Sequence, residues 1–171
     1  MISIYLLKYR RSPGILYLSL MQLSTAIWAF FYGLEFATTD LQLKIFWSKF
    51  SYIGIVFAPV FFYFFSVYFA SKQLKLSKAL KAGLIGLAVL FLVSVFTNGF
   101  HSLHWVSYAI DPANNTTIYQ YGISFWLVFV FCYTLLILSI ANIIPLLFDF
   151  PKRFQGQILL LVLACFFPVV G

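Results

Sequence analysis

The sequence predicts an all-α fold, a polytopic bundle of transmembrane helices with four complete spans and a truncated fifth. Of the 171 residues, 63% are hydrophobic and only 9% are charged, a balance that soluble domains of this size do not have. Several apolar runs approach or exceed the about 20 residues that a helix needs to cross a bilayer. The Lys and Arg residues also gather in alternate loops, which is typical of multi-pass membrane proteins.

The four complete spans are expected at residues 14–36, 45–70, 82–96 and 123–148, and the truncated one begins at residue 157. The first span follows a Ser-Pro-Gly segment, which is typical of a loop that precedes a helix. The second contains Pro59, which removes one helix hydrogen bond and kinks the axis. In the third, Gly83 and Gly86 each follow an alanine by four residues. This spacing predicts that another helix approaches closely there.

The distribution of basic residues predicts the orientation in the membrane. Apart from Lys44 and Lys49, they lie in residues 8–13, 71–81 and 149–156, which the positive-inside rule assigns to the cytoplasm. Residues 37–44 and 97–122 are then extracytoplasmic, and we expect a multi-pass protein of the plasma membrane. The formal charge of +7 therefore reflects topology and contact with anionic membrane lipids, and does not indicate a nucleic-acid partner.

The whole chain, residues 1–171, is expected to form one transmembrane domain that is cut at both ends. The segment before Lys8 is apolar and looks like the end of a preceding span. At the other end, the apolar run that begins at residue 157 is too short to cross the hydrocarbon core. We therefore expect this domain to be a fragment of a longer protein.

The end of the first span and the start of the second carry charges that need an explanation. Trp28, Tyr32 and Glu35 share one helix face by their spacing, and Trp47 lies on a similar stripe of the next span. A carboxylate facing lipid at mid-bilayer would cost about 2.5–3.5 kcal/mol, and less near the interface. Glu35 is therefore expected to be solvated, to pair with Lys49, or to bind a ligand or a proton.

Two histidines and the absence of catalytic motifs limit the metal and catalytic sites that this fragment is expected to contain. His101 and His104, three residues apart, could ligate a metal or haem if they shared a helix face. Flanked by Trp105 and Tyr108, they are more typical of the aromatic belt at a membrane interface. The sequence also lacks a phosphate-binding loop and a nucleophile with its base. We expect no catalytic residue, no metal site and no cofactor in this fragment.

Scattered aromatic and polar positions give the chain a resemblance to a known family. They are Trp28, Tyr32, Glu35, Lys44, Trp47, Tyr52, Gly54, Pro59, Thr97, Asn98, His101 and Trp105, together with the KYRRSPG segment. With these residues the sequence resembles the N-terminal seven-transmembrane sensor region of bacterial and archaeal histidine kinases. The resemblance implies that the complete spans are the second to fifth of seven helices. It also implies a cytoplasmic signalling module in the same chain, such as the kinase of a two-component system.

The resulting hypothesis is a membrane-embedded sensory input domain that binds an unknown cue and relays it to that module. The candidate ligand-binding residues are Trp28, Tyr32, Glu35, Trp47, Asn98 and His101. Membrane lipids, the cue and the cytoplasmic module are the expected partners, and a homodimer is left open. The alternative is a fragment of a small-molecule transporter or permease with Pro59, Asn142 and Pro145 along its path, although the two halves show no internal repeat. A membrane-embedded enzyme ranks last.

Overall fold

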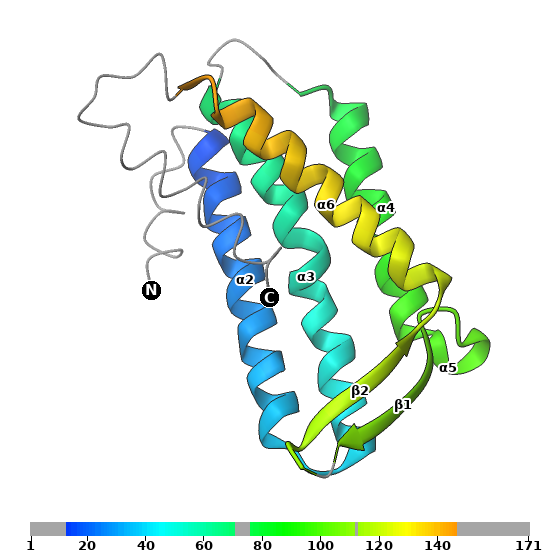
Figure 1. Ribbon diagram of the computed structural model, residues 1–171. Helices are drawn as coiled ribbons and strands as arrows, with labels where there is room; N and C mark the ends of the chain where they lie inside the picture. Colours follow the sequence, from blue (N-terminus) through cyan, green and yellow to red (C-terminus); the bar gives the residue numbers. More distant parts are fainter. Residues whose placement is uncertain (1–12, 71–75, 112, 147–171) are drawn as a thin grey trace.

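The computed structural model describes residues 13–70, 76–111 and 113–146. Within them, four helices are long and apolar enough to span a membrane, which confirms the predicted fold class. They are α2 (Pro13–Ala37), α3 (Leu41–Ala70), α4 (Lys78–Phe96) and α6 (Ile123–Ile143), and Figure 1 shows them side by side as a bundle. Each corresponds to one predicted span. The predicted truncated span, from residue 157, lies outside the described residues.

Two of the helices begin before their apolar pattern does, because capping residues precede them. α3 begins four residues ahead of the expected residue 45, and the Asp40 Oδ1 accepts a hydrogen bond of 2.9 Å from the Leu43 N–H. α4 begins four residues ahead of residue 82, and the Ser77 Oγ accepts one of 3.1 Å from the Leu80 N–H. Side-chain oxygens at these positions satisfy backbone donors that the first helical turn leaves free.

α3 is the central helix and packs against the other three spans. Its residues Val56, Val60 and Phe64 are spaced four apart, so they lie along one face, and all three are fully buried. They belong to one apolar cluster with Ala88 of α4 and Val128 of α6. The core of the bundle therefore follows the length of α3.

α2 and α3 cross closely at Gly54. A Cβ atom built on this glycine would lie 2.6 Å from both the Cβ and the N of Trp28, and it would also overlap the Ser24 carbonyl oxygen. At Gly83 and Gly86, where the spacing predicts a close helix neighbour, a Cβ would meet no described atom within 4 Å. Among the described residues, the glycine that allows close helix packing is thus Gly54.

Residues 97–122, expected to form an extracytoplasmic loop, contain a short helix and a β-hairpin. α5 (Asn98–His101) is followed by two antiparallel strands, β1 (Trp105–Asp111) and β2 (Thr116–Tyr121). The strands are rich in aromatic and β-branched residues, which favour a pleated and half-buried surface. An isolated two-stranded hairpin is only marginally stable in water. This small sheet, which adds to the helical fold, therefore depends on the helices that it contacts.

The hairpin lies at the same end of the bundle as the turn between α2 and α3 (Figure 1). The other end holds the starts of α2 and α4 and the end of α3. There the Lys81 Nζ donates hydrogen bonds of 3.4 Å to the Tyr17 hydroxyl and 3.3 Å to the Tyr68 hydroxyl. Residues 37–44 and 97–122, which were predicted to lie on the same side of the membrane, thus both lie at the hairpin end of the bundle.

Candidate functional site

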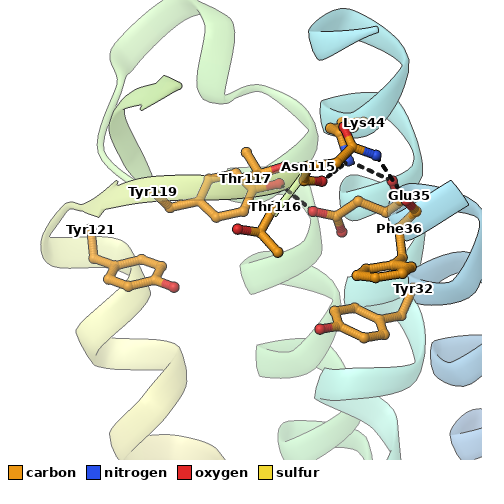
Figure 2. Close-up of a pocket in the computed structure, with 9 residues that line it drawn as sticks. All are labelled: Tyr32, Glu35, Phe36, Lys44, Asn115, Thr116, Thr117, Tyr119 and Tyr121. Atoms are coloured by element: carbon orange, nitrogen blue, oxygen red, sulfur yellow. Dashed lines mark hydrogen bonds between the residues drawn. The ribbon is translucent and has the colours of Figure 1, made fainter. Parts of the chain in front are cut away.

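A cavity of about 200 Å³ lies where the hairpin meets the ends of α2 and α3. Figure 2 shows the side chains that surround it. It is lined by Tyr32, Glu35, Phe36, Lys44, Asn115, Thr116, Thr117, Tyr119 and Tyr121. These residues come from two helices and from one strand with the turn before it, so the cavity exists only when the hairpin is in place.

Glu35, in the last turn of α2, contributes a carboxylate to the cavity. Only 8% of the residue is exposed, and its Oε1 accepts a hydrogen bond of 2.8 Å from the Tyr119 hydroxyl of β2. Burial raises the pKa of Tyr119, and the negative charge of Glu35 raises it further. The phenol is therefore neutral at physiological pH and is held in the state that donates to the carboxylate.

Lys44, in the first turn of α3, is 1% exposed. Its Nζ donates hydrogen bonds of 3.0 Å to the Glu35 carbonyl oxygen and 2.7 Å to the Asn115 carbonyl oxygen. Burying an unpaired ammonium would be very costly, and these two acceptors offset the loss of water. The lysine thereby ties the C-terminal end of α2, the start of α3 and the turn of the hairpin together.

Asn115 completes the connection between the hairpin turn and α2. Its backbone has a φ of 51°, in the left-handed region that Asn tolerates better than most residues. Its Nδ2 donates hydrogen bonds of 3.3 Å to the Phe36 carbonyl and 3.1 Å to the Thr38 carbonyl. Since the last carbonyls of a helix lack partners within the helix, Asn115 satisfies one acceptor at the end of α2 and one in the turn that follows it.

The predicted stripe on α2 and α3 divides between this cavity and the helix interface. Tyr32 and Glu35 line the cavity, whereas Trp28 contacts the α3 backbone near Gly54. Trp47 stacks on Phe31, with ring centroids 5.9 Å apart, and is not among the lining residues. The structure therefore brings two of the four stripe residues to one site.

The remaining two predicted ligand residues, Asn98 and His101, organise the junction before β1. The Asn98 Oδ1 accepts hydrogen bonds of 2.8 Å from the His104 N–H and 3.1 Å from the Trp105 N–H, and its Nδ2 donates one of 3.0 Å to the Trp105 carbonyl. His101 accepts a bond of 2.9 Å at Nδ1 from the Leu103 N–H. Both residues lie outside the cavity lining.

His101 and His104 do not share a helix face, because α5 ends at His101. His104 is buried among the rings of Tyr52, Trp105 and Phe125, at centroid distances of 4.7, 4.9 and 5.9 Å. Burial, with a smaller effect of the nearby His101, lowers the pKa of His104 to about 4. Among the described residues, no group of three or more His, Cys, Asp and Glu side chains is placed to hold a metal ion.

The proposed pairing of Glu35 with Lys49 is not formed. The Lys49 Nζ instead donates a hydrogen bond of 3.3 Å to the Phe96 carbonyl at the end of α4. The lysine that reaches the Glu35 segment is Lys44, and it binds the backbone carbonyl of Glu35. Position in the sequence does not distinguish the two lysines, since both lie in the first half of α3. The tertiary packing decides which of them reaches Glu35.

Sequence reasoning missed the cavity residues of the hairpin because it expected a loop there. Thr117, Tyr119 and Tyr121 all line the cavity, and alternate residues of a strand point to the same face. This period-two pattern in the segment TTIYQY was the available signal. Once β2 is recognised, the three residues are expected on one face.

We expect Asn98→Ala to destabilise the hairpin junction. Asn98 is buried, and its loss leaves two backbone donors and one acceptor without their partner. Each unsatisfied buried group costs about 1–3 kcal/mol, so the apparent melting temperature of the detergent-solubilised protein should fall. Asn114→Ala is the matched control, because the Asn114 amide is exposed and donates to the Asp111 side chain. Equal melting temperatures for both variants would contradict this role of Asn98.

Comparison with protein families gives the chain an assignment. A family model described as the N-terminal 7TM region of histidine kinase matches residues 1–171. No curated protein and no solved structure gives a significant match. Regions of this family are membrane sensory inputs and are not themselves catalytic, and the family implies a cytoplasmic signalling domain in the same chain. The match confirms the resemblance seen in the sequence, and the chain belongs to the family of N-terminal 7TM regions of histidine kinases.

Proposed function

We propose that this domain detects a cue that binds in the cavity between the hairpin and the ends of α2 and α3. The observation that carries the proposal is the pair of connections around the cavity, Tyr119 to Glu35 and Lys44 to Asn115. Together they join two helices to a hairpin that is distant in sequence. A ligand that binds the Glu35 carboxylate shares the group that accepts the Tyr119 hydrogen bond, so occupancy changes how the hairpin packs on the helices.

The route from the cavity to the other end of the bundle runs along α2 and α3. Glu35 lies in the last turn of α2 and Lys44 in the first turn of α3. At the opposite ends of the same helices, Tyr17 and Tyr68 contact Lys81 of α4. A small shift at one end can move a bundle between two discrete packings. The cue then acts by binding one packing better than the other.

In the proposed orientation the cavity faces the extracytoplasmic side of a prokaryotic plasma membrane. The support is the charge distribution, because the Lys and Arg residues within 8–13, 71–81 and 149–156 favour the cytoplasmic side for these segments. Residues 1–171 then form one sensor domain within a longer chain, and its output module, a histidine kinase in this proposal, lies in the cytoplasm. A homodimer would allow two such modules to act on one another.

The transporter hypothesis placed Pro59, Asn142 and Pro145 along a substrate path. Pro59 is buried within α3. The Asn142 Nδ2 donates a hydrogen bond of 3.2 Å to the Ser66 Oγ and so joins α6 to α3. None of the three residues lines the cavity described above. The observations on the site therefore favour sensing as the function to test first.

Glu35→Gln tests whether the cavity takes part in signalling. The amide keeps the shape of the side chain but removes the charge, and hydrogen bonds to a charged acceptor are roughly twice as strong as neutral ones. Weakening the Tyr119 contact should shift the balance between the two packings. We expect the basal output of the full-length protein, measured with a transcriptional reporter, to change several-fold at unchanged membrane abundance.

Asp40→Asn is the matched control for this experiment. It also converts an acid to an amide near the same helix ends, and Asn caps a helix about as well as Asp does. Its capping bond to the Leu43 N–H can therefore be kept. If both variants signal like the wild type, the cavity is not the sensory site.

A further inference from the structure

The cavity combines one carboxylate with four aromatic rings. Glu35 lies among Tyr32 and Phe36 of α2 and Tyr119 and Tyr121 of β2. In Figure 2 the carboxylate points into the space between these two groups of rings. Exposed aromatic residues at the ends of spans often serve only as interfacial anchors. Here, however, they surround a buried acid, which an interfacial belt does not require.

Of the two charged groups that line the cavity, the carboxylate is the one available to a ligand. Lys44 is 1% exposed, and its ammonium is held by the Glu35 and Asn115 carbonyl oxygens. Glu35 is more exposed, at 8%, and Tyr119 binds only its Oε1. In Figure 2 Lys44 lies on the other side of the carboxylate from Tyr32 and Tyr121. A ligand that enters past these two rings meets negative charge first.

The rings at the mouth are partly exposed, and one face of Tyr121 stacks on Phe125 with ring centroids 3.8 Å apart, which leaves its other face to a bound molecule. Tyr32 is 57% exposed and Tyr121 is 46% exposed. The face of an aromatic ring attracts a cation within about 6 Å of its centroid, and sites for quaternary ammonium ligands are built from such rings. The volume of about 200 Å³ is large enough for a small molecule, since one water molecule occupies about 30 Å³ of liquid.

We infer that the cavity binds a small organic cation, a protonated amine or a quaternary ammonium group. Glu35 serves as its counter-ion, and Tyr32 and Tyr121 contact it through their ring faces. This inference rests on the proposed function, in which the same cavity receives the cue. It names the chemical class of that cue.

Calorimetric titration of the full-length protein in lipid nanodiscs tests the ligand class. The probes are methylammonium chloride and tetramethylammonium chloride, with sodium chloride at equal ionic strength as the blank and sodium acetate as the anionic probe. We expect at least one ammonium probe to bind and acetate not to bind. Glu35→Gln should weaken ammonium binding tenfold or more, because it removes the counter-ion.

Substitutions at the mouth separate the rings from the charge. Tyr32→Leu and Tyr121→Leu should each weaken binding of the ammonium probe several-fold. Tyr32→Phe, the matched control, keeps the ring face and should bind within about twofold of the wild type, because the hydroxyl is not needed for a cation–π contact. Tyr32 is largely exposed, so Tyr32→Leu tests ligand contact with little effect on folding. Tyr121 also stacks on Phe125 at a ring-centroid distance of 3.8 Å, so the melting temperature of Tyr121→Leu is measured beside its binding.

Three results would overturn the inference: no binding of either ammonium probe, equal binding to the Glu35→Gln variant, or binding of acetate in preference to both. The reporter experiment separates these from a failure of the proposed function. A Glu35→Gln variant with altered output and a protein that binds no amine would leave the cavity as the sensory site for another ligand. Amine binding by the wild type, together with unaltered reporter output of the Glu35→Gln variant, would show a cation site that does not signal.

Discussion

Gly54→Leu is expected to separate α2 from α3 and to cause a large loss of stability. A Cβ at this position would meet the Trp28 Cβ and N at 2.6 Å and overlap the Ser24 carbonyl oxygen. Two of these three atoms belong to the backbone of α2, so they can move only if the helix moves. Overpacking of a tight core costs about 1–3 kcal/mol and occasionally more. The rigid neighbours and the size of leucine place this variant at the upper end.

The matched controls for Gly54 are Gly33→Leu in α2 and Gly83→Leu in α4. A Cβ at either position meets no described atom within 4 Å. All three changes replace a helical glycine and gain about 1 kcal/mol of helix propensity each. Differences in the apparent melting temperature of the detergent-solubilised proteins therefore report packing. We expect a marked decrease for Gly54→Leu alone, and a melting temperature equal to the controls would show that the helices do not cross closely there.

Lys44→Met is expected to release the hairpin from the helices. The substitution keeps a long flexible side chain but removes the ammonium that binds the Glu35 and Asn115 carbonyl oxygens. Hydrogen bonds to charged groups contribute about 1.5–3 kcal/mol each, and two of them are lost together. The carbonyl of Asn115 lies 71 residues from Lys44 in the sequence. Losing the hydrogen bond between them therefore removes a long-range connection between the hairpin and α3.

Hydrogen–deuterium exchange measures this release directly. The backbone amides of β1 and β2 should exchange faster in Lys44→Met, since local opening exposes hydrogen bonds that docking protects. Lys49→Met is the control, because it makes the same change in the same helix at a lysine that donates one bond of 3.3 Å to the Phe96 carbonyl. Unchanged exchange in both strands would mean that Lys44 does not hold the hairpin.

The two predictions concern the same assembly, because Gly54 and Lys44 control how α2, α3 and the hairpin are placed. Gly54 sets the separation of α2 and α3 along their length, and Lys44 joins the ends of these two helices beside the cavity. We expect a variant that moves either contact also to move Glu35 relative to Tyr119, to which it is joined by a hydrogen bond of 2.8 Å. The sensory function proposed for the cavity therefore predicts altered basal output in both variants.

Local pattern was sufficient to predict the four spans and their order. Each rests on a run of apolar residues whose length matches the bilayer, and tertiary contacts are not needed to find it. The same spacing arguments placed Tyr32 beside Glu35, and both line the cavity. The ends of the helices were less accurate, because Asp40 and Ser77 extend α3 and α4 into polar sequence.

The partners of the charged residues were decided by the tertiary structure. The sequence alone offered Lys49 as a partner of Glu35, but the fold brings the nearer Lys44 to the Glu35 carbonyl and Asn115 across 71 residues to Lys44. The glycines with the expected small-residue spacing face no described neighbour, whereas Gly54 lies against α2. The spacing and types of residues in a sequence predict which side chains lie on each face of one helix. Which residue meets that face depends on how separate elements pack, and only the folded chain determines it.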